Sequence, residues 1–600
     1  MLTTYLLTVL IFMAAKVVFM LCHAEGHPFD VSDVAGVVGH GLSLDLSTAL
    51  YFLIVPFLLS LASLWVRVPR WLLLSYTMVM AVVLALAFVA DTSLYSFWQF
   101  KLDASCLQYL ETPTEAMASV SWGYIAVRLL ALVLLVTLLF SVYRWPIGFL
   151  CAVAPLMPRL KAFAAGLAGL LLMAPVFIIG IRGGLDESTT NIGQAYYSPN
   201  QFLNHSAVNP VFSFLSSLGK SGNYIVSYDY FSDEECAWLT DGLFPRQSQT
   251  ADTLLTTPRP NIVVVIMESC GGQFTEMGGH PEIMPRFNKL CREGVFFSEC
   301  YANSWRTDKG VVSVLSGYPA FPVTSVMKIP EKSRKLPSLA GSLAAEGYST
   351  AFYYGGDINF TNMRSYLMAT GFQQVRWKAD YSRDEQRSAQ WGVCDELMFA
   401  SLLSDIKAER SSRWMKTLLT LSSHEPWDVG THELEDPVYN AFNYLDRCLG
   451  RFVDELRRLP IWDNLLLVVL PDHGYRYQGI GETTRLYNHV PMLWLGGAVD
   501  GPRRMDMLCN QSDLAATLLG QMGIDHQAFI FSRDVVSNTY CRPMAWHTST
   551  DCLSLYDSTG WMAYNLDAGQ FIAREGAHAD SLLRVAKALL QLTSRDLRSR

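Results

Sequence analysis

Four residues of types that bind metal ions or attack phosphorus stand where predicted strands end or a predicted helix begins. Glu268 follows the apolar run IVVVIM, and Asp472 and His473 follow the run LLLVVL and one proline. Thr307 opens a segment with helical spacing. Because ligands bind outside the carboxyl ends of strands in open α/β sheets, these groups are expected to converge on one crevice. The spacing predicts a metal site that contains a hydroxyl nucleophile.

The combination of residue types indicates nucleophilic catalysis at a metal ion. A metal ion lowers the pKa of a coordinated hydroxyl and orients it, which turns the weak nucleophile Thr307 into a competent one. A helix N-terminus at the same residue would stabilise a bound phosphate. Each residue alone also fits a structural role, since Thr307 can cap a helix and Asp472-His473 can form a turn. Four such residues at element ends favour a site.

The elements that would position these residues follow an alternating pattern. Strands are predicted at 262–267, 295–301, 349–354, 415–422, 465–470 and 489–495, and helices at 284–293, 307–316, 336–346, 441–459 and 512–522. Strands that alternate with helices predict a mostly parallel central sheet with helices on both faces.

The first part of the chain has a different composition. The whole chain is 51% hydrophobic and 17% charged, against about 25% charged in an ordinary soluble protein. Five apolar runs are long enough to cross a bilayer, at 2–22, 46–65, 71–90, 124–143 and 162–181. The first run lacks the basic start and the small-residue cleavage site of a signal peptide, so we interpret it as a retained helix. The segment 145–157 is too short to span and is expected at the interface.

The charges of the loops predict the orientation of these spans. The loop 23–45 holds four acidic residues and no Lys or Arg, whereas the turn 66–70 and the segment 144–161 are basic. The loop 91–121 has Lys101 as its only Lys or Arg. By the positive-inside rule the N-terminus is cytoplasmic, and an odd number of spans places everything after residue 182 outside the cytoplasm. Lys16 and Arg128 lie within spans, where bundle-facing or interfacial placement is expected.

These observations predict four regions. Residues 1–182 are a five-helix transmembrane bundle, 183–256 a connector with membrane-associated helices, 257–545 the α/β catalytic domain and 546–600 a C-terminal extension packed on it. The net charge of −8 gives no reason to expect a nucleic-acid partner. The 12 cysteines lack the paired spacing of a zinc site, and disulfides and free thiols both stay open.

Several motifs resemble the alkaline phosphatase/sulfatase superfamily, and most closely the lipoteichoic acid synthase branch with its phosphoglycerol and phosphoethanolamine transferase relatives. The similarity extends over five spans, a connector and the sulfatase-like domain. The supporting motifs are VIMES at 265–269, RTDKG at 306–310, YGGD at 354–357, SHEP at 423–426, NYLD at 443–446 and PDHG at 471–474.

The resemblance implies a role for each matching residue. Glu268, Thr307, Asp472 and His473 would bind one divalent ion, with Mn²⁺ favoured and Zn²⁺ or Mg²⁺ as alternatives. Thr307 would attack a membrane phospholipid, release diacylglycerol and carry the head group as a phospho-threonine to a glycan or glycolipid acceptor. Such an enzyme would be a multi-pass protein of the bacterial inner membrane with an extracytoplasmic catalytic domain. The substrate contacts would come from His424, His489, Arg306, Asp357, Asn362 and Arg364.

One departure from the family pattern leaves the head group open. Lipoteichoic acid synthases carry a Phe-Trp-Asn-Arg element, whereas here 357–364 reads DINFTNMR and lacks the Trp in either alignment. Phosphoglycerol and phosphoethanolamine both stay open. A phosphodiesterase or another hydrolase is the alternative function. Thr307 stands where a formylglycine sulfatase needs a Cys or Ser within its C/S-x-P-x-R motif, which argues against that class.

Overall fold

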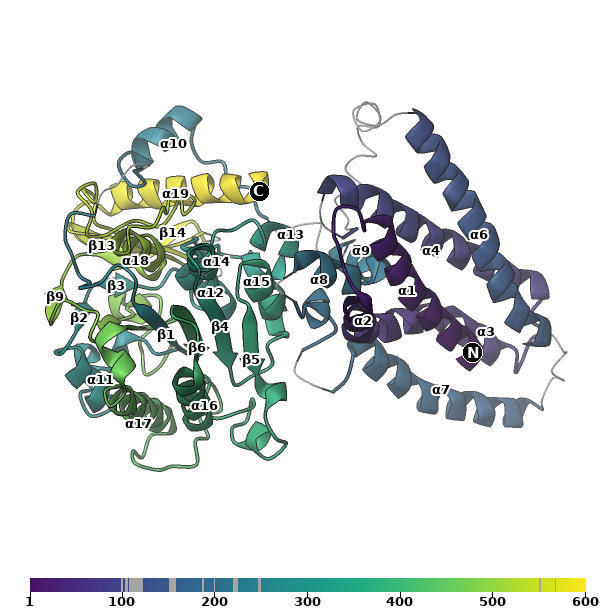
Figure 1. Ribbon diagram of the computed structural model, residues 1–600, viewed down its shortest axis with the longest axis horizontal. Coiled ribbons are helices and arrows are strands. Elements are labelled where there is room, and N and C mark those ends of the chain that lie inside the picture. Colours follow the sequence, from purple (N-terminus) through teal and green to yellow (C-terminus); the bar gives the residue numbers. More distant parts are fainter. Residues whose placement is uncertain are drawn as a thin grey trace. The chain divides into compact units, whose positions relative to one another are not determined.

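The chain folds into two compact units, residues 1–223 and 224–600, which are described separately. The computed structural model (Figure 1) describes residues 1–98, 101–102, 106, 122–150, 158–185, 188–198, 200–218, 225–245, 250–549, 552–566 and 568–600.

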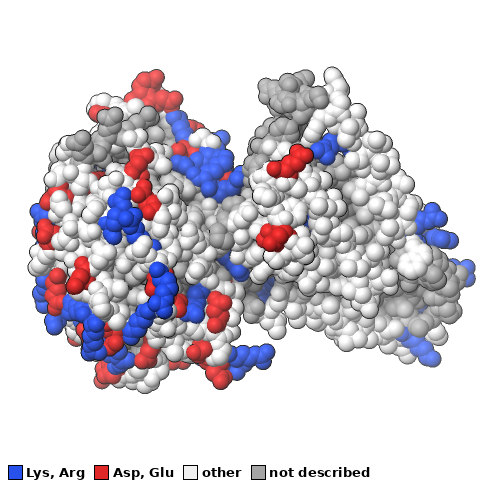
Figure 2. All heavy atoms as spheres, viewed as in Figure 1, with Lys and Arg blue, Asp and Glu red and all other residues white. Residues whose placement is uncertain are grey.

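The first unit is entirely helical in its described residues. Five helical stretches are long and apolar enough to cross a membrane, namely Leu2–Cys22, Val31–Ala62, Arg70–Ser96, Trp122–Trp145 and Arg159–Arg182. They correspond to α1 (Leu2–Cys22), α2 (Val31–Tyr51) with α3 (Ile54–Ala62), α4 (Arg70–Trp98), α6 (Trp122–Leu150) and α7 (Arg159–Arg182). The predicted five spans are thus confirmed. Figure 2 shows that the visible surface of this unit carries few charged side chains.

One span begins earlier than predicted. Helix α2 starts at Val31, inside the segment expected to be a loop, because Asp30 forms a capping box with Asp33. The two carboxylates satisfy backbone N–H groups that would otherwise lack partners. The acidic loop is therefore shorter than the sequence indicated. Helix α6 reaches Leu150, and the rest of the segment expected at the interface, 151–157, lies outside the described residues.

Buried charges in this unit are paired. Lys16 of α1 lies 2.6 Å from Asp45 of α2, and both side chains are almost completely enclosed. Asn209 donates from Nδ2 to the other oxygen of Asp45 at 2.9 Å. Lys101 forms a second buried pair with Asp91 of α4. Each charge therefore has its counter-charge within the bundle.

Short helices follow the bundle. The 3₁₀ turn η2 (Ile192–Ala195), α8 (Gln201–Ala207) and α9 (Pro210–Leu218) pack against α1, α2 and α4. Asn191 and Asn200 cap η2 and α8 through their side-chain oxygens. In the second unit, α10 (Asp233–Thr240) packs on the C-terminal helix α19 (Ala579–Ser599).

The second unit is built on an eight-stranded sheet, and the predicted α/β class is confirmed. The strand order is β5-β4-β6-β1-β7-β8-β2-β9. Only β8 runs against its neighbours. The strands are β1 (Asn261–Met267), β2 (Val295–Phe297), β4 (Ser349–Tyr354), β5 (Gln374–Trp377), β6 (Trp414–Leu419), β7 (Leu465–Pro471), β8 (Met492–Leu495) and β9 (Arg503–Met505).

Both faces of the sheet are covered, which explains why its central strands are uniformly apolar. On β1, Val264 and Ile266 point into one hydrophobic core and Val263 and Val265 into another. The first core includes residues of α12 (Thr307–Ser316), α14 (Leu339–Ala345), α15 (Met363–Ala369), α18 (Leu514–Gln521) and α19. The second includes residues of α11 (Pro285–Leu290), α16 (Asp395–Ala408) and α17 (Pro437–Leu456).

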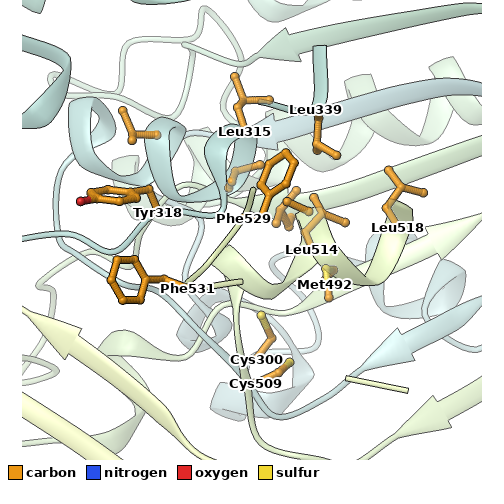
Figure 3. Close-up of a cluster of buried hydrophobic side chains, with 14 of the residues drawn as sticks. Cys300, Leu315, Tyr318, Leu339, Met492, Cys509, Leu514, Leu518, Phe529 and Phe531 are labelled. Atoms are coloured by element: carbon orange, nitrogen blue, oxygen red, sulfur yellow. The ribbon is translucent and has the colours of Figure 1, made fainter. Parts of the chain in front are cut away.

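The predicted strand 295–301 is divided between two sheets. Ser298 ends β2, and β3 (Cys300–Tyr301) pairs in parallel with β10 (Cys509–Asn510). Cys300 and Cys509 are register partners and lie beside the cluster of Leu315, Phe529 and other apolar side chains (Figure 3). Residues after 545 add a four-stranded antiparallel sheet, made of β11 (Ala545–Thr548), β12 (Cys552–Asp557), β13 (Gly560–Asn565) and β14 (Gln570–Glu575).

Candidate active site

The sheet register brings Glu268 and Asp472 side by side. Met267 and Pro471 are the last paired residues of the neighbouring strands β1 and β7. The residues that follow them, Glu268 and Asp472, therefore leave the sheet at the same level and on adjacent strands. Strand β6 ends on the other side of β1, where Thr420 accepts a hydrogen bond from the Glu268 backbone N–H at 2.9 Å. Three strand ends thus form one edge.

Four predicted residues meet at this edge. The Thr307 hydroxyl donates to Glu268 Oε2 at 3.1 Å and lies 3.5 Å from His473 Nε2. His473 Nε2 is 3.5 Å from both Glu268 Oε1 and Asp472 Oδ2. One ligand atom from each of Glu268, Asp472 and His473 falls within 4.8 Å of the others. The predicted constellation is therefore assembled in the fold.

The charges of this cluster call for a cation. Burial raises the pKa of Asp472 to about 8, and the negative charge of Glu268 acts in the same direction. Burial also opposes ionisation of Glu268, but the neighbouring His473 outweighs it and lowers that pKa to about 2. Asp472 Oδ2 is buried and, within the part of the chain that the structure describes, accepts no hydrogen bond, with His473 Nε2 at 3.5 Å. An orphaned buried carboxylate oxygen is the expected mark of a metal ligand.

The donor set fits a divalent ion. Two carboxylates, one hydroxyl and one imidazole nitrogen offer three oxygens and one nitrogen, a set that suits Mn²⁺ or Mg²⁺ and that Zn²⁺ also accepts. His473 Nδ1 lies 2.7 Å from the carbonyl oxygen of Gly474. Donation of Nδ1–H to that carbonyl leaves the lone pair of Nε2 directed into the cluster, as a metal-binding histidine requires.

A strained residue orients both carboxylates. Ser269 adopts a left-handed backbone conformation with φ of 59°, which is uncommon for a residue with a side chain. In this conformation its N–H donates to Asp472 Oδ1 at 2.8 Å and its hydroxyl to Glu268 Oε1 at 2.9 Å. Backbone strain of this kind concentrates at functional sites, where it fixes a geometry.

The candidate nucleophile is carried by the first turn of α12. Thr307 is the first helical residue, and the N–H groups of Lys309 and Gly310 donate to the Arg306 carbonyl at 3.0 and 2.8 Å. The N–H groups of Thr307 and Asp308 precede these bonds and have no intrahelical acceptor. Gly310 allows the helix to approach strand β7, since a Cβ at this position would lie 2.2 Å from the Asp472 carbonyl oxygen. Gln511 Nε2 joins the two elements by donating to Gly310 O at 3.2 Å and Asp472 O at 3.0 Å.

His424 lies in the loop that follows β6. Its positive form would act on Glu268, since this histidine contributes to the lowered pKa of that carboxyl. The loop is held by the buried Asp395, which accepts hydrogen bonds from Leu421 N at 2.8 Å and Ser422 N at 3.2 Å. Burial raises the pKa of Asp395 to about 6 despite these bonds. Ser423, the residue before His424, donates from its hydroxyl to the Glu268 carbonyl at 2.7 Å, so the loop that carries His424 contacts this candidate metal ligand.

The segment 357–364, which was expected to contact the head group, is linked to the residue after Thr307 by contacts of Lys328. Asn362 Nδ2 donates to the Lys328 carbonyl at 3.4 Å, and Lys328 Nζ lies 3.3 Å from Asp308, the residue after Thr307. Thr361 and Asn362 both have positive φ. Asp357 turns back on its own loop and accepts from Asn359 N at 3.0 Å.

The remaining predicted residues differ in exposure. Arg306 is half exposed beside Asp308, with a nitrogen–oxygen distance of 3.7 Å. Arg364 is largely buried over Trp377, and burial lowers its pKa. His489 is buried, with Nε2 2.5 Å from the Ser298 carbonyl, and Nδ1 lacks a hydrogen-bond partner. A phosphate contact by His489 stays a prediction.

Sequence reasoning missed the residues that hold the ligands in place. Ser269 lay within a quoted motif without a role, and its backbone conformation has no sequence signal. Gln511 is far from both groups that it joins and follows no motif. Lys309, within the RTDKG motif, donates from its ammonium to the carbonyls of Phe321 and Pro322 at 2.5 and 2.8 Å. Burial lowers the pKa of this lysine to about 8.

Comparison with known proteins agrees with this geometry. Residues 260–524 match the family model described as Sulfatase. The chain is 20% identical over 288 residues to lipoteichoic acid synthase 2 of Bacillus subtilis. This alignment covers 43% of this chain and 44% of that protein. It is 22% identical over 304 residues to phosphoglycerol transferase I of Xanthomonas campestris. That alignment covers 47% of this chain and 43% of the relative. The alignments thus cover less than half the length of these relatives.

A solved structure supports the fold. A protein in the alkaline phosphatase superfamily from Vibrio parahaemolyticus superposes with a TM-score of 0.55 at 24% identity, over 62% of this chain and 98% of that one. The sequence-based resemblance is confirmed: residues 260–524 match the sulfatase family model, and the chain is similar to lipoteichoic acid synthases and phosphoglycerol transferases.

Proposed function

We propose that the protein is a metal-dependent transferase that moves a phosphoglycerol or phosphoethanolamine head group from a membrane phospholipid to a glycan or glycolipid acceptor outside the cytoplasm. The observation that carries the proposal is the Thr307 hydroxyl, which lies 3.1 Å from Glu268 and 3.5 Å from His473 at a helix N-terminus. A phosphodiester placed on the first turn of α12 would meet a nucleophile, backbone donors and metal ligands together.

The chemistry then follows from the side chains. A bound divalent ion supplies charge neutralisation and lowers the pKa of the Thr307 hydroxyl. Thr307 Oγ forms a bond to phosphorus while the bond to the diacylglycerol oxygen breaks, and the leaving oxygen takes up a proton. An acceptor hydroxyl attacks the same phosphorus in the second half and releases Thr307. His424 and Arg306 are proposed to contact the phosphoryl oxygens.

The five apolar helices support a membrane location beside the lipid donor. We propose that residues 1–182 anchor the protein in the inner membrane, with 183–256 as connector and 257–545 as the catalytic domain, extended by 546–600. The basic 66–70 and 144–161 segments support a cytoplasmic N-terminus and an extracytoplasmic active site.

The test uses the detergent-solubilised full-length protein with labelled phosphatidylglycerol or phosphatidylethanolamine and Mn²⁺. Mass spectrometry is expected to find a head-group phosphate on Thr307, and diacylglycerol is expected to appear. Thr307→Ala should abolish both, whereas Thr559→Ala, in the exposed β12–β13 turn, should abolish neither. Diacylglycerol release that persists in Thr307→Ala would show that this residue is not the nucleophile.

A further inference from the structure

A carboxylate with aromatic neighbours borders the active site. Glu425 directly follows His424 and is exposed. The hydroxyl of Tyr475 donates to the Glu425 carboxylate, and Trp391 donates from its indole nitrogen to the Glu425 carbonyl oxygen. The ring of Trp391 lies 5.3 Å from that of His424 in an edge-to-face arrangement. Three loops therefore meet at Glu425.

These loops also carry the reacting groups. Tyr475 comes two residues after the metal ligand His473, and Glu425 comes one residue after His424. The hydrogen bond between Tyr475 and Glu425 thus bridges the loop after β7 and the loop after β6. The Trp427 ring, 5.7 Å from Tyr475, extends the aromatic wall. A group bound beside Glu425 would therefore lie next to the loops that carry His424 and His473.

The charge of Glu425 is not used within the protein. Among the residues that the structure describes, none forms an ion pair with it, although the neighbouring surface carboxylate Glu433 pairs with Arg447 at 2.6 Å. The Tyr475 hydroxyl that donates to this carboxylate is a neutral group and does not cancel its negative charge. The exposed face of Trp391, 38% accessible, lies alongside. One carboxylate with aromatic faces attracts an ammonium group, whose charge it neutralises while the rings contact its methylene groups.

We propose that Glu425, Trp391 and Tyr475 form a subsite for a primary ammonium group of the substrate. The ammonium is supplied either by the ethanolamine of a phospholipid donor or by an amino sugar of the acceptor. The subsite rests on the proposed function, and it addresses the choice of head group that the segment 357–364 left open. A glycerol head group has no positive charge and would gain only neutral hydrogen bonds from Glu425.

The experiment measures the ratio of the activities with two phospholipid donors. Diacylglycerol release and the Thr307 adduct are measured for phosphatidylethanolamine and phosphatidylglycerol without acceptor. Wild type is expected to prefer phosphatidylethanolamine by about tenfold, and Glu425→Gln, which keeps the oxygen acceptor but removes the charge, should lower the ratio by about tenfold. Trp391→Leu should lower it by a smaller factor. The control Asp500→Asn, at an exposed turn before β9, should leave it unchanged.

A second arm tests the acceptor. If the donor ratio is the same in Glu425→Gln and wild type, transfer to a glucosamine-containing glycan is compared with transfer to its N-acetylated form. A loss of preference for the free amine in Glu425→Gln would support the subsite and assign its ammonium to the acceptor. Thr307 adducts with unchanged donor and acceptor ratios would overturn the subsite alone. Absence of any Thr307 adduct in wild type would overturn the proposed function and the subsite with it.

Discussion

The two units of the chain handle buried charge in opposite ways. Among the helices of the first unit, Lys16 and Asp45 are enclosed but neutralise each other, with Asn209 filling the remaining oxygen. At the carboxyl edge of the sheet in the second unit, Glu268 and Asp472 face each other with one imidazole between them, and Asp472 Oδ2, 3.5 Å from His473 Nε2, accepts no hydrogen bond from the described residues. The first arrangement pairs each charge with one counter-charge, whereas the second shares one imidazole between two carboxyl groups.

This difference distinguishes buried charges that only stabilise the fold from buried charges that form a ligand site. Removing two charges from water costs free energy. When the two charges neutralise each other, the pair serves the fold and leaves no charge for a ligand. Two buried carboxylates without enough cations destabilise the fold unless a ligand supplies the missing charge. The imbalance, rather than burial, therefore marks the second cluster as a site.

The largest effect is expected from removing one carboxylate of the imbalanced cluster. Asp472→Asn keeps the Oδ1 acceptor for the N–H groups of Ser269 and His473. It should lower transferase activity by about a thousandfold, because a ligand of the catalytic ion is lost. In the chelator-treated protein at pH 9, above the pKa of about 8 of Asp472, it should also raise the melting temperature, since the repulsion between two ionised carboxylates is gone.

Thermal unfolding with and without Mn²⁺ measures the second effect. Wild type should be stabilised by the ion, and Asp472→Asn should show little or no such shift. A metal-free Asp472→Asn protein that melts well below metal-free wild type would show that the carboxylate is structural, and the comparison between the two units would fail.

The balanced cluster should respond in the opposite manner. Lys16→Met leaves Asp45 buried and unpaired, which is expected to cost about 3–5 kcal/mol of stability. The double change Lys16→Met with Asp45→Leu should recover most of that loss. Melting in detergent of the two single variants and the double variant measures the coupling. Additive losses in the double variant would mean that the two residues do not act as a pair.

A third way to bury a polar group is to keep it neutral, and His547 illustrates it. Burial lowers the pKa of this histidine to about 3, and its Nδ1 lies 2.9 Å from the Ala302 carbonyl. Since the unfolded chain takes up a proton near pH 6.5 and the folded one does not, stability is present above that pH and is lost below it. The loss should reach about 2 kcal/mol at pH 5.

The measurement compares wild type with His547→Gln between pH 7.5 and 5. The difference in unfolding free energy between the two proteins should change with pH in this window, because the variant lacks the titrating group. Parallel pH profiles would indicate that His547 is protonated in the folded state.

The smallest effect is expected at Ser269. Ser269→Gly relieves the positive φ of 59°, which costs about 1 kcal/mol or more in residues with a side chain, so the variant should be about as stable as wild type or slightly more stable. It also removes the hydroxyl that donates to Glu268. Mn²⁺ affinity measured by calorimetry should fall by about tenfold. Unchanged affinity would mean that the Ser269 hydroxyl has no role in orienting Glu268 for the metal ion.

The sequence indicated the parts of the fold that depend on local patterns. The apolar runs at 262–267 and 465–470 are strands because both faces of the sheet are covered. The helix predicted at 307–316 has the same bounds in the structure. Residues at the ends of these elements, Glu268, Thr307 and Asp472, could be predicted as neighbours because parallel strands end at one edge.

Features that depend on distant contacts were not accessible in this way. Lys16 and Asp45 meet because helix α2 extends into the segment interpreted as a loop. Gln511 reaches two carbonyls from an element about two hundred residues away from Gly310. Trp391 reaches the active-site rim through tertiary packing, and the predicted strand 295–301 changes sheets at Ser298. None of these positions has a periodic or motif signal.

The pair of Lys16 and Asp45 also constrains how the protein is made. A lone charge at the centre of a spanning helix disfavours its transfer into lipid by about 2.5–3.5 kcal/mol, and α1 and α2 each carry one. The first helix emerges from the ribosome before its partner, so its lysine has no counter-ion until α2 is synthesised. Stable integration of α1 into the bilayer is therefore expected to depend on α2, whose Asp45 supplies the neutralising carboxylate.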